Sequence, residues 1–254
     1  MKKSSIGETF LVILFWIGIW AVGAALVGKA VLLPSPVSVF ARIFVLMGEM
    51  QFWKILLLSL LRMMEGILIA IICGVLLGFF TCRYHWLEAL LAPLLTVIKV
   101  TPVASFIILA LIWIGRDTVP AIIAGMMVLP VVWTNVASGL RQTDAGLLEM
   151  AQVYGVCPKV TLRRIVIPSV MPYFLSAVQT GVGIGWKAGI AAEVLTVPTF
   201  AIGKMIYESK LYLETVDLFA WSVVVILISL LIEKLMMAAI RRLGRRYYVG
   251  GEGR

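Results

Sequence analysis

Long runs of apolar residues alternate with short polar segments along almost the whole chain. The runs cover about residues 10–33, 55–82, 89–114, 119–140, 165–197 and 218–240. Each is long enough for a helix to cross the roughly 30 Å of bilayer hydrocarbon. A helix is expected because backbone groups in lipid must find their hydrogen-bond partners within the segment. The pattern therefore predicts an all-α integral membrane protein, a single domain over residues 1–254 with about six transmembrane helices.

Prolines and charges interrupt this pattern at two places. The first run ends in a Pro-Ser-Pro segment at residues 34–36, which cannot continue a helix smoothly. Residues 36–52 then mix apolar and charged side chains, which is typical of an amphipathic helix near the outer membrane surface. The third run contains Pro93 and Pro102 with Lys99 between them, so we expect it to be kinked or broken.

Composition supports a membrane protein and argues against a nucleic-acid-binding protein. The residues are 62% hydrophobic and 14% charged, and a soluble fold could not hide that much apolar surface. The net charge of +9 would suit a partner rich in phosphates, but the cations fall in alternate gaps between the runs, as in cytoplasmic loops. We therefore expect no nucleic-acid partner and both termini in the cytoplasm. The cations in these gaps are Lys2, Lys3, Arg83, Arg141, Lys159, Arg163, Arg164, Arg241, Arg242, Arg245 and Arg246.

Residues that bind metals or act as nucleophiles are sparse. His85 is the only histidine, and Cys73, Cys82 and Cys157 have no disulfide or metal-site spacing. We expect neither a metal nor a cofactor. The first run continues to about Leu33 without a small-residue cleavage pattern, so we interpret it as a retained span and not as a signal peptide.

Two of the runs carry small residues at every fourth position. This spacing places them on one helix face, where they let another helix approach closely in the membrane. We expect both faces to be packing faces. The two series are Gly66, Ala70, Gly74 and Gly78 in the second run, and Ala177, Gly181, Gly185 and Gly189 in the fifth.

The longest polar stretch, residues 141–168, predicts a helix-turn-helix. Asp144 can cap a short helix, Gly155 suits its left-handed end, and Pro158 can begin the next helix. The first helix is too short to span a membrane, yet it has an apolar stripe that needs a partner.

This stretch resembles the "EAA" loop of ABC importer permeases. The loop has a Glu-Ala-Ala, then a glycine and later an isoleucine and a Leu-Pro pair. This sequence departs from it with Met150 for the first alanine and Ile167 for the leucine. The matching residues are Glu149, Ala151, Gly155, Ile165 and Pro168. Further matches, in order along nearly the whole chain, look closest to the nitrate, sulfonate and taurine branch of the family.

The resemblance implies a complete transport assembly around this chain. In the family the loop forms a coupling helix that docks on a cytoplasmic ATPase. The resemblance also implies a second permease copy as a homodimer, an extracytoplasmic solute-binding protein, and a prokaryotic plasma membrane. The sequence agrees, because no Gly-x-x-x-x-Gly-Lys-Ser/Thr phosphate loop occurs in it, so ATP hydrolysis is expected on a separate chain.

Four charged residues inside the runs are candidates for function. Arg62 and Lys99 have structural interpretations: Arg62 can neutralise Glu65 three residues on, and Lys99 can either line the pathway or extend to an interface. Lys187 and Glu193 are costly in lipid unless paired or functional. We expect Lys187 to face the pathway and favour anions. Glu193 is a second pathway candidate, with an inter-helix partner role near the outer end as the main interpretation.

Two other function classes compete with the importer interpretation. A secondary transporter or channel would use intramembrane charges as an ion relay, but the chain shows no ordered series of acidic residues and no clear inverted repeat. A membrane enzyme would need converging catalytic groups and is the weakest alternative. The solute itself is not encoded in an obvious motif. The excess of cations within the runs favours a small anion such as nitrate, taurine or an alkanesulfonate.

Overall fold

The protein is helical throughout the part described by the computed structural model, residues 6–248. Lys2 and Lys3 lie outside the described residues, as do the side chains of Arg241, Arg245 and Arg246. The elements in chain order are α1 (Ile6–Val27), α2 (Pro36–Met47), α3 (Met50–Arg83), α4 (His85–Val100), α5 (Val103–Trp113), α6 (Val119–Arg141), α7 (Ala145–Val153), α8 (Pro158–Thr161), the π-helical turn η1 (Leu162–Val166), α9 (Ile167–Thr196), α10 (Ile202–Leu211) and α11 (Thr215–Tyr248). The all-α prediction is confirmed.

The membrane-crossing helices follow the apolar runs, with two differences. Among the described residues, α3, α6, α11 and the continuous segment Pro158–Thr196 are long and apolar enough to cross a bilayer. The third run gives α4 and α5, which are bent by 107° at a break and count as a fifth crossing if taken together. The break lies next to Pro102, as expected, whereas Pro93 lies inside α4. The first run gives a shorter apolar stretch, Leu11–Val27.

The predicted amphipathic segment 36–52 is divided in the structure. Its helix, α2, ends at Met47, and a turn at Gly48 and Glu49 leads directly into α3. Ser35 caps α2, and its side chain accepts a hydrogen bond from the amide of Ser38. The prediction of one helix was wrong because Glu49 adopts an extended conformation at the start of α3.

The core is a layer of three long helices in which α6 lies between α3 and α9. Small residues of α3 allow its close approach to α6. A Cβ built on Gly74 would lie 2.9 Å from the Cβ of Val132, and one on Gly78 would lie 2.9 Å from the Cβ of Val136. Real Cβ atoms do not approach so closely, so larger residues at either glycine would push the helices apart.

The second small-residue series, on α9, lies against α6 and α3. A Cβ on Gly185 would lie 2.6 Å from Cγ2 of Val128, and one on Gly181 would lie 3.1 Å from Cγ1 of the same valine. A Cβ on Gly189 would collide with the sulfur of Met63. In lipid the hydrophobic effect does not drive helices together, so the van der Waals contacts of such close packing stabilise their association instead.

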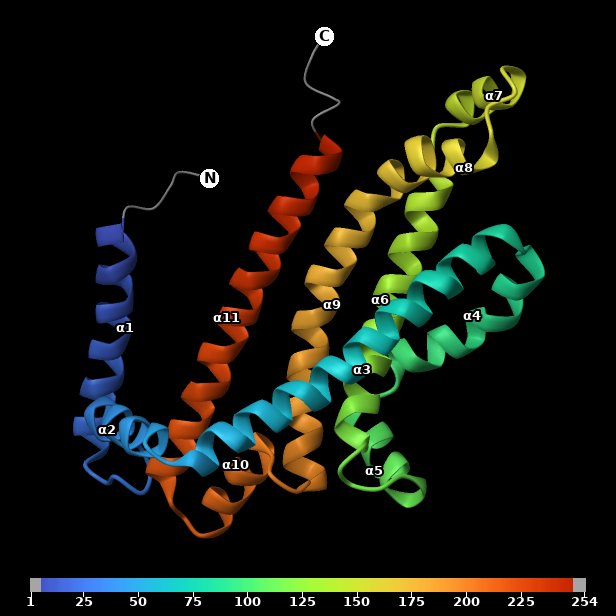
Figure 1. Ribbon diagram of the computed structural model, residues 1–254. Coiled ribbons are helices and arrows are strands. Elements are labelled where there is room, and N and C mark those ends of the chain that lie inside the picture. The colour runs from blue at the N-terminus through green and yellow to red at the C-terminus, as the bar shows by residue number, and fades with distance from the viewer. Residues whose placement is uncertain (1–5, 249–254) are drawn as a thin grey trace.

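The two ends of the molecule differ in structure. At one end, α7 and α8 project beyond the long helices, and α1 begins and α11 ends toward this side (Figure 1). At the other end lie α2 and α10 (Figure 1). There the guanidinium of Arg42 donates two hydrogen bonds to the carboxylate of Asp217, at 2.6 and 2.8 Å, and so ties α2 to α11.

Candidate functional site

The segment between α6 and α9 starts with a capped helix. The Asp144 carboxylate accepts hydrogen bonds from the amides of Gly146 at 2.8 Å and Leu147 at 3.4 Å. These are amides of the first turn, which have no partner inside the helix. Asp144 therefore sets the start of α7, as the sequence predicts.

The end of α7 is a Schellman turn built around Gly155. Gly155 has a φ of 64°, in the left-handed region. Its amide donates to the carbonyl of Gln152 at 3.1 Å, and the amide of Val156 donates to the carbonyl of Ala151 at 2.8 Å. This pair of bonds defines the motif and reverses the chain toward α8. A glycine is favoured there because a Cβ in this conformation is strained.

The surface of α7 is apolar and largely without intramolecular cover. Val153 is 82% exposed and Tyr154 79%, and Met150 is 49% exposed. Ala151 is the buried residue of the helix, at 3%, and Glu149 is exposed beside this surface. A short helix with an exposed apolar face at the end of a molecule is typical of a surface that fits into a partner's groove.

The return from α8 to α9 passes through the π-helical turn. The amide of Ile167 donates to the carbonyl of Leu162, five residues back. Pro168 follows and has no backbone N–H, so the ordinary helical ladder cannot form at that position. Ile165 and Pro168 are both half-buried. The two residues thus lie at the junction between the polar segment and the spanning helix.

Two contacts fix the base of this segment to the helical layer. The guanidinium of Arg141, at the end of α6, lies 2.5 Å from the carboxylate of Glu88 on α4. The hydroxyl of Tyr173 on α9 donates to the side chain of Gln142, and its ring packs on Gly139. These contacts join the base of the segment directly to α4, α6 and α9.

Glu193 is enclosed between three helices. Its carboxylate is fully buried and accepts hydrogen bonds from Arg62 at 2.7 Å, Ser59 at 3.0 Å and the amide of Gly203 at 3.1 Å. The expected inter-helix role is therefore what the geometry shows, and Ser59 is a partner that the sequence did not reveal. The expected pairing of Arg62 with Glu65 is wrong, because α3 directs Arg62 toward α9.

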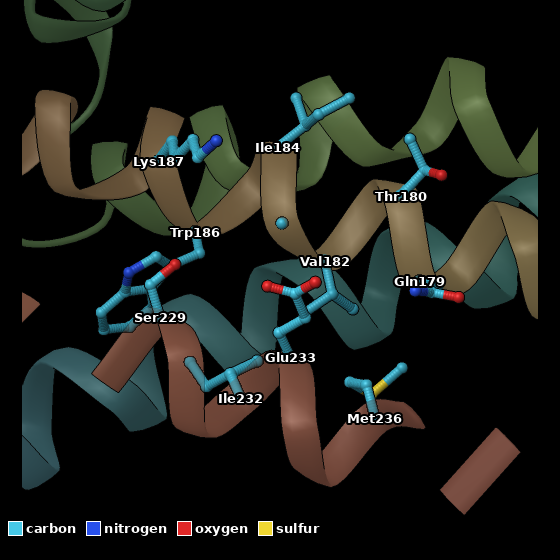
Figure 2. A pocket seen from close by; sticks show the side chains of 11 residues that line it. Gln179, Thr180, Val182, Ile184, Trp186, Lys187, Ser229, Ile232, Glu233 and Met236 are labelled. Atoms are coloured by element: carbon cyan, nitrogen blue, oxygen red, sulfur yellow. The ribbon is translucent and has the colours of Figure 1, made fainter. Parts of the chain in front are cut away.

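Lys99 and Lys187 lie on different helices, α4 and α9. Lys99 is exposed in the last turn of α4, just before the bend into α5. Lys187 is exposed on α9 and lines a cavity of about 360 Å³ between α9 and α11, shown in Figure 2. Glu233 of α11 lines the same cavity (Figure 2). In the sequence, Glu233 stands out as an acidic residue within the last apolar run, but it was not among the predicted site residues.

A wider cavity of about 840 Å³ lies along α3, α4 and α6. Most of its wall is apolar, and Arg62, Glu65 and Asp117 supply its charges. In the described part of the chain no three histidine, cysteine or acidic residues come together as metal ligands would.

A family model for the "Binding-protein-dependent transport system inner membrane component" matches residues 66–248. The chain belongs to this family. It is a permease subunit of an importer-type ABC transporter, a transport component rather than an enzyme, and the resemblance seen in the sequence is confirmed. The matched region covers residues 141–168 and the whole α3–α6–α9 layer except the first part of α3.

Individual relatives lie in the same functional group. The Taurine transport system permease protein TauC of Escherichia coli (strain K12) is 24% identical over 94% of this chain and 88% of its own length. The Putative aliphatic sulfonates transport permease protein SsuC of Bacillus subtilis (strain 168) is 28% identical over 91% of this chain and 82% of its own. These relatives agree with the branch inferred from the sequence.

Solved structures share the fold. The inward-facing MetNI methionine ABC transporter superposes with a TM-score of 0.55, at 16% identity, over 77% of this chain and 93% of the matched chain. An amino acid ABC transporter with histidines gives a TM-score of 0.53 at 17% identity, over 74% of this chain and 91% of the other.

Proposed function

We propose that this chain, paired with a second copy of itself, forms the membrane pathway of an ABC importer in a prokaryotic plasma membrane, and that residues 141–168 couple the pathway to ATP hydrolysis. The observation that carries the proposal is the exposed apolar surface of α7, held between the Asp144 cap and the Gly155 turn. Glu149, Ala151, Gly155, Ile165 and Pro168 are the residues proposed to act in coupling.

The direction of the assembly follows from charge. Arg141, Lys159, Arg163 and Arg164 all lie in or beside the segment that contains α7. An excess of cations marks the cytoplasmic side. We therefore place α7 in the cytoplasm against an ATPase subunit, and the opposite end, with α2 and α10, toward an extracytoplasmic solute-binding protein.

The proposed cargo is a small solute with an anionic group, such as nitrate, taurine or an alkanesulfonate. Lys187 and Lys99 are exposed cations on helices of the membrane domain, and both are candidates to line the pathway. Glu193 has no exposed surface in the described chain, so we assign it to holding α3, α9 and α10 together.

Co-purification tests the coupling proposal. The tagged chain is purified from its native membrane in mild detergent, and the bound proteins are identified by mass spectrometry. We expect an ATPase with a phosphate loop to be retained, and to be lost in Glu149→Lys. Glu49→Lys, the same charge reversal on an exposed residue between α2 and α3, serves as control and is expected to retain it. A chain that purifies alone and transports in vesicles without ATP is instead a secondary transporter.

A further inference from the structure

The cavity between α9 and α11 contains both charges and several polar groups. Its α9 wall includes Gln179, Thr180 and Lys187, and its α11 wall includes Ser229 and Glu233 (Figure 2). Within the described part of the chain, no ion pair joins Lys187 or Glu233 to another side chain. Two opposite charges therefore line one cavity without neutralising each other.

Trp186, one of the residues that line the cavity, carries a buried donor without a partner. Trp186 is only 2% exposed, and its indole Nε1 is the one buried side-chain polar atom with no hydrogen bond in the part of the chain that the structure describes. Its N–H can only donate. Buried donors are nearly always satisfied, so an exception beside a cavity indicates a missing acceptor.

We propose that this cavity binds the transported solute, and that the solute is a small zwitterion with an anionic oxygen group and a protonated amine. Lys187 and the indole of Trp186 bind the oxygens. Glu233 binds the amine. That the bound solute is also transported rests on the proposed function, whereas binding itself depends only on this cavity.

Size and charge both favour this class. A cavity of about 360 Å³ lies in the range of small-molecule sites. A simple anion would be attracted by Lys187 but repelled by Glu233. A simple cation would be attracted by Glu233 but repelled by Lys187. Val182, Ile232 and Met236 supply apolar surface for the short carbon chain between the two charged groups. The proposal thus selects an amino-sulfonate or amino acid over nitrate and over unsubstituted alkanesulfonates.

The test is direct binding to the full chain in lipid nanodiscs, without ATPase or ATP, by calorimetry. Three probes of matched size separate the charges: taurine carries both, ethanesulfonate lacks the amine, and ethylammonium lacks the sulfonate. We expect taurine to bind at least about tenfold more tightly than either of the others, because each lacks one charge-assisted partner.

Variants assign the contacts. Lys187→Met should weaken taurine binding about tenfold or more, whereas Lys234→Met, a neighbouring α11 lysine outside the cavity, should leave it unchanged. Glu233→Gln should weaken taurine about tenfold and leave ethanesulfonate equal or tighter. Trp186→Phe keeps the ring and removes the donor, so taurine and ethanesulfonate should both weaken by about threefold.

Three results would overturn the inference: no taurine binding to the wild-type chain, equal affinity for taurine and ethanesulfonate, or the same effect of Lys187→Met and Lys234→Met. Failure here is distinct from failure of the proposed function. A chain that retains its ATPase but binds no zwitterion keeps the importer assignment and loses this site. A chain that binds taurine but retains no ATPase keeps this site and loses the importer assignment.

Discussion

Substitution of Gly155 tests whether the turn after α7 matters for coupling. Gly155 is left-handed, with φ at 64°, and a Cβ built on it meets no atom within 4 Å. Crowding by neighbours therefore contributes nothing, and only backbone strain remains. That strain is about 1–2 kcal/mol for a residue with a Cβ, and asparagine tolerates the conformation better than alanine or valine.

The strain converts directly into affinity if the ATPase recognises α7 only with its Schellman turn formed. A cost of about 1–2 kcal/mol corresponds to about 5- to 30-fold weaker binding. The expected order of affinity for the ATPase is Gly155, then Gly155→Asn, then Gly155→Ala, with Gly155→Val the weakest because its branched side chain restricts the backbone further.

The assay is titration of the partner ATPase onto the chain in nanodiscs, followed by binding and by stimulated ATP hydrolysis. Gly18→Ala is the matched control, because Gly18 lies within α1 and a Cβ there also meets nothing within 4 Å, but its backbone is helical. Wild-type affinity for Gly155→Val would refute the reasoning. Equal losses for the asparagine and valine variants would refute the part that assigns the effect to backbone strain.

Two further predictions concern stability, measured by thermal unfolding in nanodiscs. Gly74→Leu should destabilise the chain by about 1–3 kcal/mol, because the side chain must displace Val132, whereas Gly18→Leu should be neutral; equal unfolding temperatures would contradict the packing argument. Arg62→Met should cost about 3–5 kcal/mol by leaving buried Glu193 without its cation. Adding Glu193→Gln should restore part of that loss, and a double variant less stable than the single one would show that charge is not the cause.

Locally determined features of the proposed coupling segment were predictable. Asp144 caps a helix through amides two and three residues away, and Gly155 ends it through bonds within five residues. The resemblance to the EAA loop rests on residues of the same short segment. By contrast, Trp186 and Glu233 were not identified as parts of one cavity, because they lie on helices that the sequence does not pair.

The prediction for Arg62 shows the limit of arguments from one helix. Arg62 and Glu65 have the spacing at which side chains of a helix meet, so pairing between them was reasonable. In the structure Arg62 instead pairs with Glu193, 131 residues away. The closely packed α3–α6–α9 layer buries Glu193, so its cation has to come from another helix.

The sequence by itself determined that the chain is an all-α membrane protein, where its apolar runs break, and where the short helix α7 begins and ends. These properties depend on hydropathy, proline and capping, all of which act over a few residues. Only the tertiary structure decided which charges pair between helices and which lie unpaired beside a cavity. Those outcomes depend on the relative rotation and distance of α3, α9 and α11, which are set by packing along whole helices and not by any one segment.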